Sequence, residues 1–158
     1  MTQTTASVRV AAFARAALVA AVVIILDQVT KSLVRSDIPL GDHRRFLPGI
    51  ITFVHDRNTG VAFTLFAGGG ALVLVVTFAA LALLIGYFAI HPGRALLWLP
   101  TGMLVGGAIG NLIDRIARGG VTDFIQLPHW PAFNVADMSI TFGVLTLLWV
   151  LEGPRAKQ

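Results

Sequence analysis

The sequence predicts an α-helical integral membrane protein of one domain, residues 1–158, with four transmembrane helices and a small strand pair outside the membrane. Hydrophobic residues make up 56% of the chain and charged residues only 13%. The mean hydropathy is +0.79, which is too high for an ordinary soluble domain of this length. Polar segments divide the chain into four apolar runs, each long enough to cross a bilayer.

Composition also excludes several classes of function. The chain has a net charge of +4, but its Lys and Arg residues are scattered, without the basic face that binds nucleic acid. It has no cysteine, which excludes disulfides, thiolate metal sites and a cysteine nucleophile. The four histidines lack the spacing of a zinc site, so we expect neither a metal nor a cofactor.

The first predicted transmembrane helix covers residues 10–34. Arg9 and Arg15 before the apolar run could belong to a signal peptide, but no small-x-small cleavage site follows and the helical pattern continues. Asp27 and Lys31 lie four positions apart on one face of this helix. They form either a helix-end ion pair with a snorkelling lysine or part of a site at that end.

Residues 35–70 are predicted to lie outside the membrane, because hydropathy drops and turn-forming residues appear. The β-branched and aromatic runs 50–54 and 61–65 predict a strand pair at the membrane interface. Between these runs, the residue types of Asn58, Thr59 and Gly60 favour a simple turn over a functional role.

The remaining spans are predicted at residues 71–90, 95–114 and 134–151, with a second extramembrane segment at 115–133. Gly102, Gly106 and Gly110 recur at every fourth position of the third span. This spacing leaves one helix face nearly bare, which favours close helix packing and needs no catalytic explanation.

Four spans place both termini on one side of the membrane and the polar clusters on the other. These clusters are the exits of the first and third helices, the Asn58 turn, Asp123 and the start of the fourth helix. Lys and Arg are denser in the short tails and in the turn between the second and third spans than in the longer loops. The termini are therefore predicted in the cytoplasm and the polar face outside it.

Asp123 and Asp137 are the candidate catalytic residues. They lie fourteen positions apart, so a loop carboxylate can fold back beside one on the next helix. Two adjacent carboxylates share one proton near neutrality, which is the arrangement of an aspartic protease. Asp114 is the competing candidate, but a structural salt bridge with Arg115 explains it better. Ser139 and Thr141 have no histidine near them in sequence, so a nucleophilic mechanism is weaker.

Five sequence blocks carry a resemblance to a known family, in order and spacing, from the first span to the last. They resemble the motifs of bacterial lipoprotein signal peptidase, also called signal peptidase II. The blocks are DQVTK (27–31), NTGVAF (58–63), GGAIGNLIDR (106–115), VTDF (121–124) and FNVAD (133–137). Two departures are visible: Thr122 replaces the usual valine, and the loop 125–132 is short, which could change the gate over the site.

The resemblance implies an aspartic endopeptidase of the bacterial cytoplasmic (inner) membrane, acting as a monomer. Such an enzyme removes the signal peptide of prolipoproteins just before a cysteine that carries diacylglycerol, and globomycin inhibits it. Residues 35–70 would then form a β-cradle lying on the membrane lipid. The resemblance assigns catalysis to Asp123 and Asp137, substrate binding to Asn58, Gly60, Asn111, Arg115 and Asn134, and supporting roles to Asp27, Lys31 and Asp114.

Two other functions fit parts of the sequence. Intramembrane Asp and Arg residues also occur in small proton-coupled transporters and ion relays. That function predicts charges distributed through the membrane depth and often an internal repeat, whereas the second span is uncharged and the two halves are dissimilar. A non-catalytic assembly subunit would explain the glycine face but would leave the two aspartates without a role.

Overall fold

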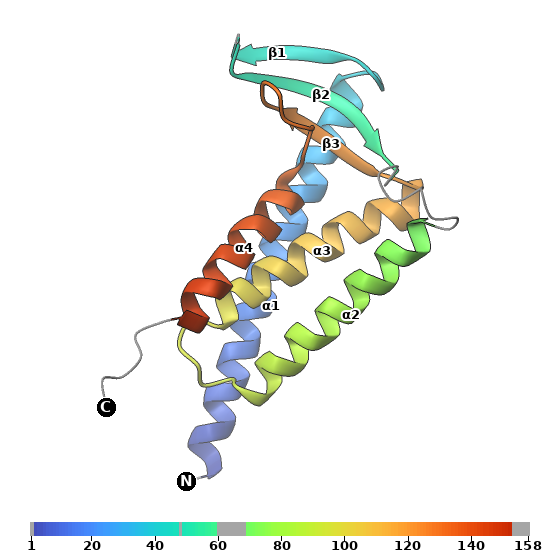
Figure 1. The fold of residues 1–158 in the computed structure, drawn as a ribbon. Coiled ribbons are helices and arrows are strands. Elements are labelled where there is room, and N and C mark those ends of the chain that lie inside the picture. The colour runs from blue at the N-terminus through green and yellow to red at the C-terminus, as the bar shows by residue number, and fades with distance from the viewer. Residues whose placement is uncertain (1, 48, 60–68, 153–158) are drawn as a thin grey trace.

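The computed structural model describes residues 2–47, 49–59 and 69–152. These residues form four helices and one three-stranded sheet, with the sheet across one end of the helices (Figure 1). In chain order the elements are α1 (Thr2–Asp37), β1 (His43–Leu47), β2 (Ile51–Asn58), α2 (Gly69–Ile90), α3 (Trp98–Arg118), β3 (Val121–Gln126) and α4 (Val135–Glu152).

α3 packs against both α1 and α4 through its glycines. A Cβ atom added at Gly102 would lie 2.6 Å from the Ala16 carbonyl oxygen, and one at Gly106 would lie 2.8 Å from that of Ala20. On the opposite face, a Cβ at Gly107 would lie 2.6 Å from the Ala136 carbonyl oxygen. The packing role predicted for the repeated glycines is confirmed, and it brings three helix backbones close together.

The sheet has the order β1-β2-β3, and both pairings are antiparallel. The predicted strand 50–54 corresponds to the first part of β2, whereas its predicted partner, 61–65, lies outside the described residues. Asn58 to Gly60 were the predicted turn, but Asn58 belongs to β2, where it pairs with Val121, and Gly60 lies outside the described residues. The prediction was wrong for Asn58, because pairing with β3 extends the strand beyond its apolar part.

Two strands were not predicted. β1 contains consecutive arginines, and β3 contains Asp123, so neither shows the apolar alternation that marks a strand. Asp123 therefore lies on a strand and not in a loop, and α3 extends to Arg118, beyond the predicted end of the third span. Pairing with β2 supplies the backbone hydrogen bonds that hold β3 in place.

The helices form where the four apolar runs predicted them. Two of them, with described spans 6–37 and 135–152, are long and apolar enough to cross a membrane, and residues 75–90 of α2 form a shorter apolar stretch. Large apolar side chains such as Leu83 and Trp149 lie on the outside of the bundle, 76% and 63% exposed. The start of α1 and the end of α4 lie at the end of the bundle away from the sheet (Figure 1).

Candidate active site

Asp123 and Asp137 both accept hydrogen bonds from Asn134, so one residue holds both carboxyls. Asp123 projects from β3 and is only 3% exposed, while Asp137 is half-buried in the first turn of α4. The side-chain amide of Asn134 donates to Asp123 Oδ1 at 2.7 Å, and its backbone N–H donates to Asp137 Oδ2 at 3.2 Å. Two carboxyls from different elements thus share one neighbour.

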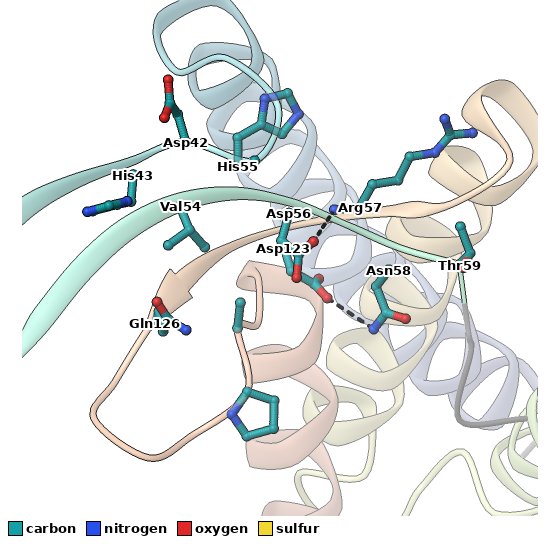
Figure 2. Close-up of a pocket in the computed structure, with 13 residues that line it drawn as sticks. Asp42, His43, Val54, His55, Asp56, Arg57, Asn58, Thr59, Asp123 and Gln126 are labelled. Carbon is teal, nitrogen blue, oxygen red and sulfur yellow. Dashed lines mark hydrogen bonds between the residues drawn. The ribbon is translucent and has the colours of Figure 1, made fainter.

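The remaining oxygen of each carboxyl accepts a hydrogen bond from a further asparagine. Asn58, at the end of β2, donates to Asp123 Oδ2 at 3.1 Å (Figure 2). Asn111, on α3, donates to Asp137 Oδ1 at 2.8 Å. Four elements, β2, β3, α3 and α4, therefore contribute to the site. All three asparagines are ones that the family resemblance had assigned to the substrate groove.

The start of α4 fixes the position of Asp137. Asn134 is the N-cap residue: its Oδ1 accepts from the Asp137 N–H at 3.0 Å, while Asp137 Oδ2 accepts from the Asn134 N–H. This reciprocal pair is a capping box with Asn and Asp in place of the usual residues. Asp27 of α1 accepts from the Ala136 N–H at 3.0 Å. The first turn of α4 is thus held by its own capping hydrogen bonds and by a hydrogen bond to α1.

Lys31 lies in the interior, not at the membrane surface. Its ammonium is 2.8 Å from Asp27 Oδ2 and 3.4 Å from Asp114 Oδ2, and all three side chains are fully buried. It also donates to Asn111 Oδ1 at 2.9 Å. The predicted ion pair between Asp27 and Lys31 is confirmed, but the snorkelling of the lysine was wrong. The buried charge is compensated by two carboxylates, and its contact with Asn111 agrees with a part in the site.

Asp114 is occupied by structural interactions. It accepts from the Thr122 N–H at 3.0 Å and lies 3.4 Å from Arg118 and 3.6 Å from Arg35. The predicted structural role agrees with these contacts, but the predicted partner, Arg115, was wrong. Consecutive helical residues point in different directions, whereas the i, i+4 spacing to Arg118 lets the side chains meet.

Arg115 is half-buried, and its side chain makes no hydrogen bond or ion pair with the described part of the chain. Gly60, the other residue expected to bind substrate, lies outside the described residues. Within those residues no group of His, Asp or Glu side chains is arranged to hold a metal ion.

Burial and the neighbouring carboxylate raise the pKa of Asp123 to about 6, with burial the larger cause. The hydrogen bonds from Asn58 and Asn134 act in the opposite direction but are weaker. A carboxyl with this pKa exchanges its proton near neutral pH, as a general acid or base in catalysis must.

The carboxyl pair lies between two cavities. A polar cavity of about 650 Å³ extends from Asp123 along β2 (Figure 2). Its lining includes Asp42, His43 and His55, which the sequence did not single out because they are isolated polar residues in a segment expected to contain turns. An apolar cavity of about 380 Å³ is lined by Asp137, Trp130 and Phe142, among others. A substrate with polar and apolar parts can reach the pair from both sides.

Comparison with known proteins identifies the family. The sequence model of the family described as signal peptidase (SPase) II matches residues 19–152. The chain belongs to the signal peptidase II family. It is 37% identical over 142 residues to the lipoprotein signal peptidase of Moorella thermoacetica, covering 89% of this chain and 95% of that protein. It is 38% identical over 135 residues to that of Bacillus velezensis, covering 82% and 88%.

A solved structure described as a bacterial membrane enzyme, determined by the in meso method at 1.9 Å resolution, has the same fold. It superposes with a TM-score of 0.79 at 33% identity, covering 87% of this chain and 92% of that one. A second structure with the same description, at 2.3 Å resolution, gives a TM-score of 0.75 at 31% identity, covering 90% and 93%. This signal peptidase II homologue is thus a peptidase and, with its apolar helices, a bacterial membrane protein.

Proposed function

We propose that the protein is an aspartic endopeptidase that removes the signal peptide from prolipoproteins. The bond cleaved is the one just before a cysteine that carries diacylglycerol. The observation that carries this proposal is that Asn134 hydrogen-bonds the carboxyls of Asp123 and Asp137 at the junction of the two cavities. The names of the curated relatives support the choice of substrate.

In this mechanism the two carboxyls share one proton and hold one water molecule. The ionised carboxyl removes a proton from the water as it attacks the scissile carbonyl, while the protonated carboxyl donates a hydrogen bond to the carbonyl oxygen. The roles reverse as the amine departs with a proton. No residue becomes covalently attached to the substrate.

The groups around the carboxyl pair are suited to an extended peptide. Asn58, Asn111 and Asn134 orient the pair. Arg115, whose side chain makes no hydrogen bond or ion pair within the described residues, binds a substrate carbonyl in this proposal. Gly60 remains a substrate-binding candidate from the family motif. The polar cavity on β2 suits the polypeptide after the cysteine. Globomycin is expected to compete for the same site.

All four helices are proposed to cross the inner membrane, with both termini in the cytoplasm and the carboxyl pair at the extracytoplasmic face. The buried charges support this arrangement: Asp27, Lys31, Asp114 and Asp123 all lie in the contact network at the sheet end of the helices. An ion relay would instead need such groups along the depth of the membrane.

The function is tested by complementation in cells depleted of their own lipoprotein signal peptidase. The wild-type chain is expected to restore conversion of a reporter prolipoprotein to its mature form, and globomycin is expected to block that conversion. Asp114→Asn and Asp123→Asn are compared at equal membrane abundance. Unprocessed reporter with the wild-type chain, or processing by Asp123→Asn at the wild-type rate, would contradict the proposal.

A further inference from the structure

We propose that Lys31 is a positioning residue. By holding the carbonyl end of the Asn111 amide, it keeps the negative charge of the carboxyl pair on Asp137 and the shared proton on Asp123. This inference rests on the proposed function. It assigns a role to a buried ion pair that the catalytic mechanism does not otherwise use.

Lys31 fixes the orientation of the Asn111 amide. Its Oδ1 accepts from the Lys31 ammonium at 2.9 Å and from the Asn134 side chain at 3.2 Å. Its Nδ2 donates to Asp137 Oδ1 at 2.8 Å. The reverse orientation would place an NH₂ group against an ammonium, which has no acceptor. Lys31 therefore ensures that Asp137 receives a donor.

The ammonium group of Lys31 is held in a fixed position. Lys31 is fully buried between Asp27 at 2.8 Å and Asp114 at 3.4 Å, so it cannot exchange these partners for water. A charged group bound to one end of an amide polarises it and strengthens the hydrogen bond from the other end, particularly in a low-dielectric interior. The positive charge of Lys31 thus acts on Asp137 through Asn111.

The surroundings of the two carboxyls differ. Asp137 lies in the first turn of α4, where the helix dipole favours an anion, and it accepts a backbone N–H as well as the polarised amide. Asp123 lies on a strand, and its hydrogen bonds come from the side-chain amides of Asn58 and Asn134. The anion is better stabilised on Asp137, so the proton resides on Asp123.

The charges around the pair are consistent with this assignment. Burial raises the pKa of Asp123, and Lys31 opposes that rise only as the smallest of five causes. The other charged residues on the elements that pack around the pair are Arg9, Arg15, Asp27, Lys31, Arg35 and Asp37 on α1, Asp56 and Arg57 on β2, Asp114, Arg115 and Arg118 on α3, and Glu152 on α4, and β2 also carries the titratable His55. In the part of the chain that the structure describes, Lys31 donates to Asn111, which itself donates to Asp137.

The experiment neutralises the ion pair without leaving one buried charge unpaired. The double variant Asp27→Asn/Lys31→Gln is compared with Asp27→Asn, which retains the lysine, and with Arg118→Gln, which removes a cation from Asp114 without touching Asn111. The full-length variants are purified in detergent. Cleavage of a diacylglyceryl-cysteine peptide is measured across pH, with circular dichroism to check the fold.

We expect kcat of the double variant to fall roughly tenfold relative to Asp27→Asn, with KM changed by less than about threefold. The acid limb of its pH profile should move to higher pH by about half a unit or more, because the anion has lost its support. The variant Asp27→Asn/Lys31→Arg, which keeps a cation at position 31, should return the acid limb of the pH profile to its position in Asp27→Asn. Arg118→Gln should leave it in place.

A double variant that folds and has the pH profile of Asp27→Asn would overturn the inference. If Asp123→Asn is inactive in the same assay, the proposed function survives that result. If the double variant does not fold, the unfolding midpoints of Asp123→Asn and Asp137→Asn at pH 5, where Asp123 holds its proton, decide the question. The inference requires the Asp137 variant to be the less stable by several degrees, and equal midpoints would overturn it.

Discussion

At the scale of single residues, Asn134 combines three tasks that no other residue type can perform together. Its amide NH₂ donates to Asp123, its amide oxygen caps α4, and its backbone N–H donates to Asp137. Aspartate or serine at this position would cap the helix but would lack the NH₂ group. The same residue therefore determines where α4 begins and how the two carboxyls are held relative to each other.

Asp123 gives the protein a measurable dependence of stability on pH. Its pKa is raised from 3.8 to about 6 in the folded state, mainly by burial. The folded protein therefore binds this proton more tightly than the unfolded chain does. The stabilisation is complete below about pH 4 and is lost as the pH rises through about 6.

We expect the wild-type protein to lose about 2 to 3 kcal/mol of stability from this group between pH 4 and pH 7. Asp123→Asn should not show this loss, because asparagine does not titrate. The measurement is the unfolding free energy of both proteins in the same detergent at several pH values. Parallel curves for the two proteins would show that Asp123 does not have a raised pKa.

At the scale of secondary structure, the position of α3 depends on its glycines. A Cβ atom at Gly110 would lie 2.7 Å from Asp27 Oδ2, the carboxylate that binds Lys31 and whose other oxygen accepts from the Ala136 N–H. Gly86 on α2 offers a matched control, because a Cβ there would meet nothing within 4 Å. The two positions separate steric fit from helix propensity.

Gly110→Ala is expected to reduce cleavage activity at least tenfold, because Asp27 must move and the start of α4 moves with it. Gly86→Ala should retain activity and should stabilise its helix by up to about 1 kcal/mol. Initial cleavage rates and unfolding midpoints measured on both variants provide the test. Equal activity of the two variants would show that the site tolerates movement of α3 against α1.

Strand β3 could not be predicted from the local sequence pattern. Its residues Val121, Thr122, Phe124 and Ile125 favour a strand, but Asp123 breaks the apolar pattern. The strand forms because β2 pairs with it, a partner more than sixty positions away in sequence. Local periodicity cannot report such a pairing. Asp123 was therefore expected in a loop, although its meeting with Asp137 was anticipated.

At the scale of the whole molecule, hydropathy predicted the helices and motif spacing predicted the family. These features were accessible because apolar runs and ordered motifs are local properties of the sequence. The partners of buried charges were less accessible. A position for Lys31 at the membrane surface was left open beside a part in a site, and Asp114 was expected to pair with Arg115, because sequence alone does not show which side chains three packed helices enclose.

The helices α1, α3 and α4 act as one frame for the site. Glycine contacts fix the distances of α3 from α1 and α4, and the ion pairs of Lys31 and Asp114 join α1 to α3. Asp27 then joins α1 to the first turn of α4. The carboxyl pair is thus held by contacts deep in the helix bundle as well as by the sheet above it.

We propose that Asp123 and Asp137 act as one catalytic unit. It is tested most directly by the kcat of purified Asp123→Asn, Asp137→Asn and the double variant on a diacylglyceryl-cysteine peptide. We expect each single variant to lose at least about a thousandfold in kcat, and the double variant to lose little more, because residues of one unit are not additive. Near-wild-type cleavage by either folded single variant would contradict the account.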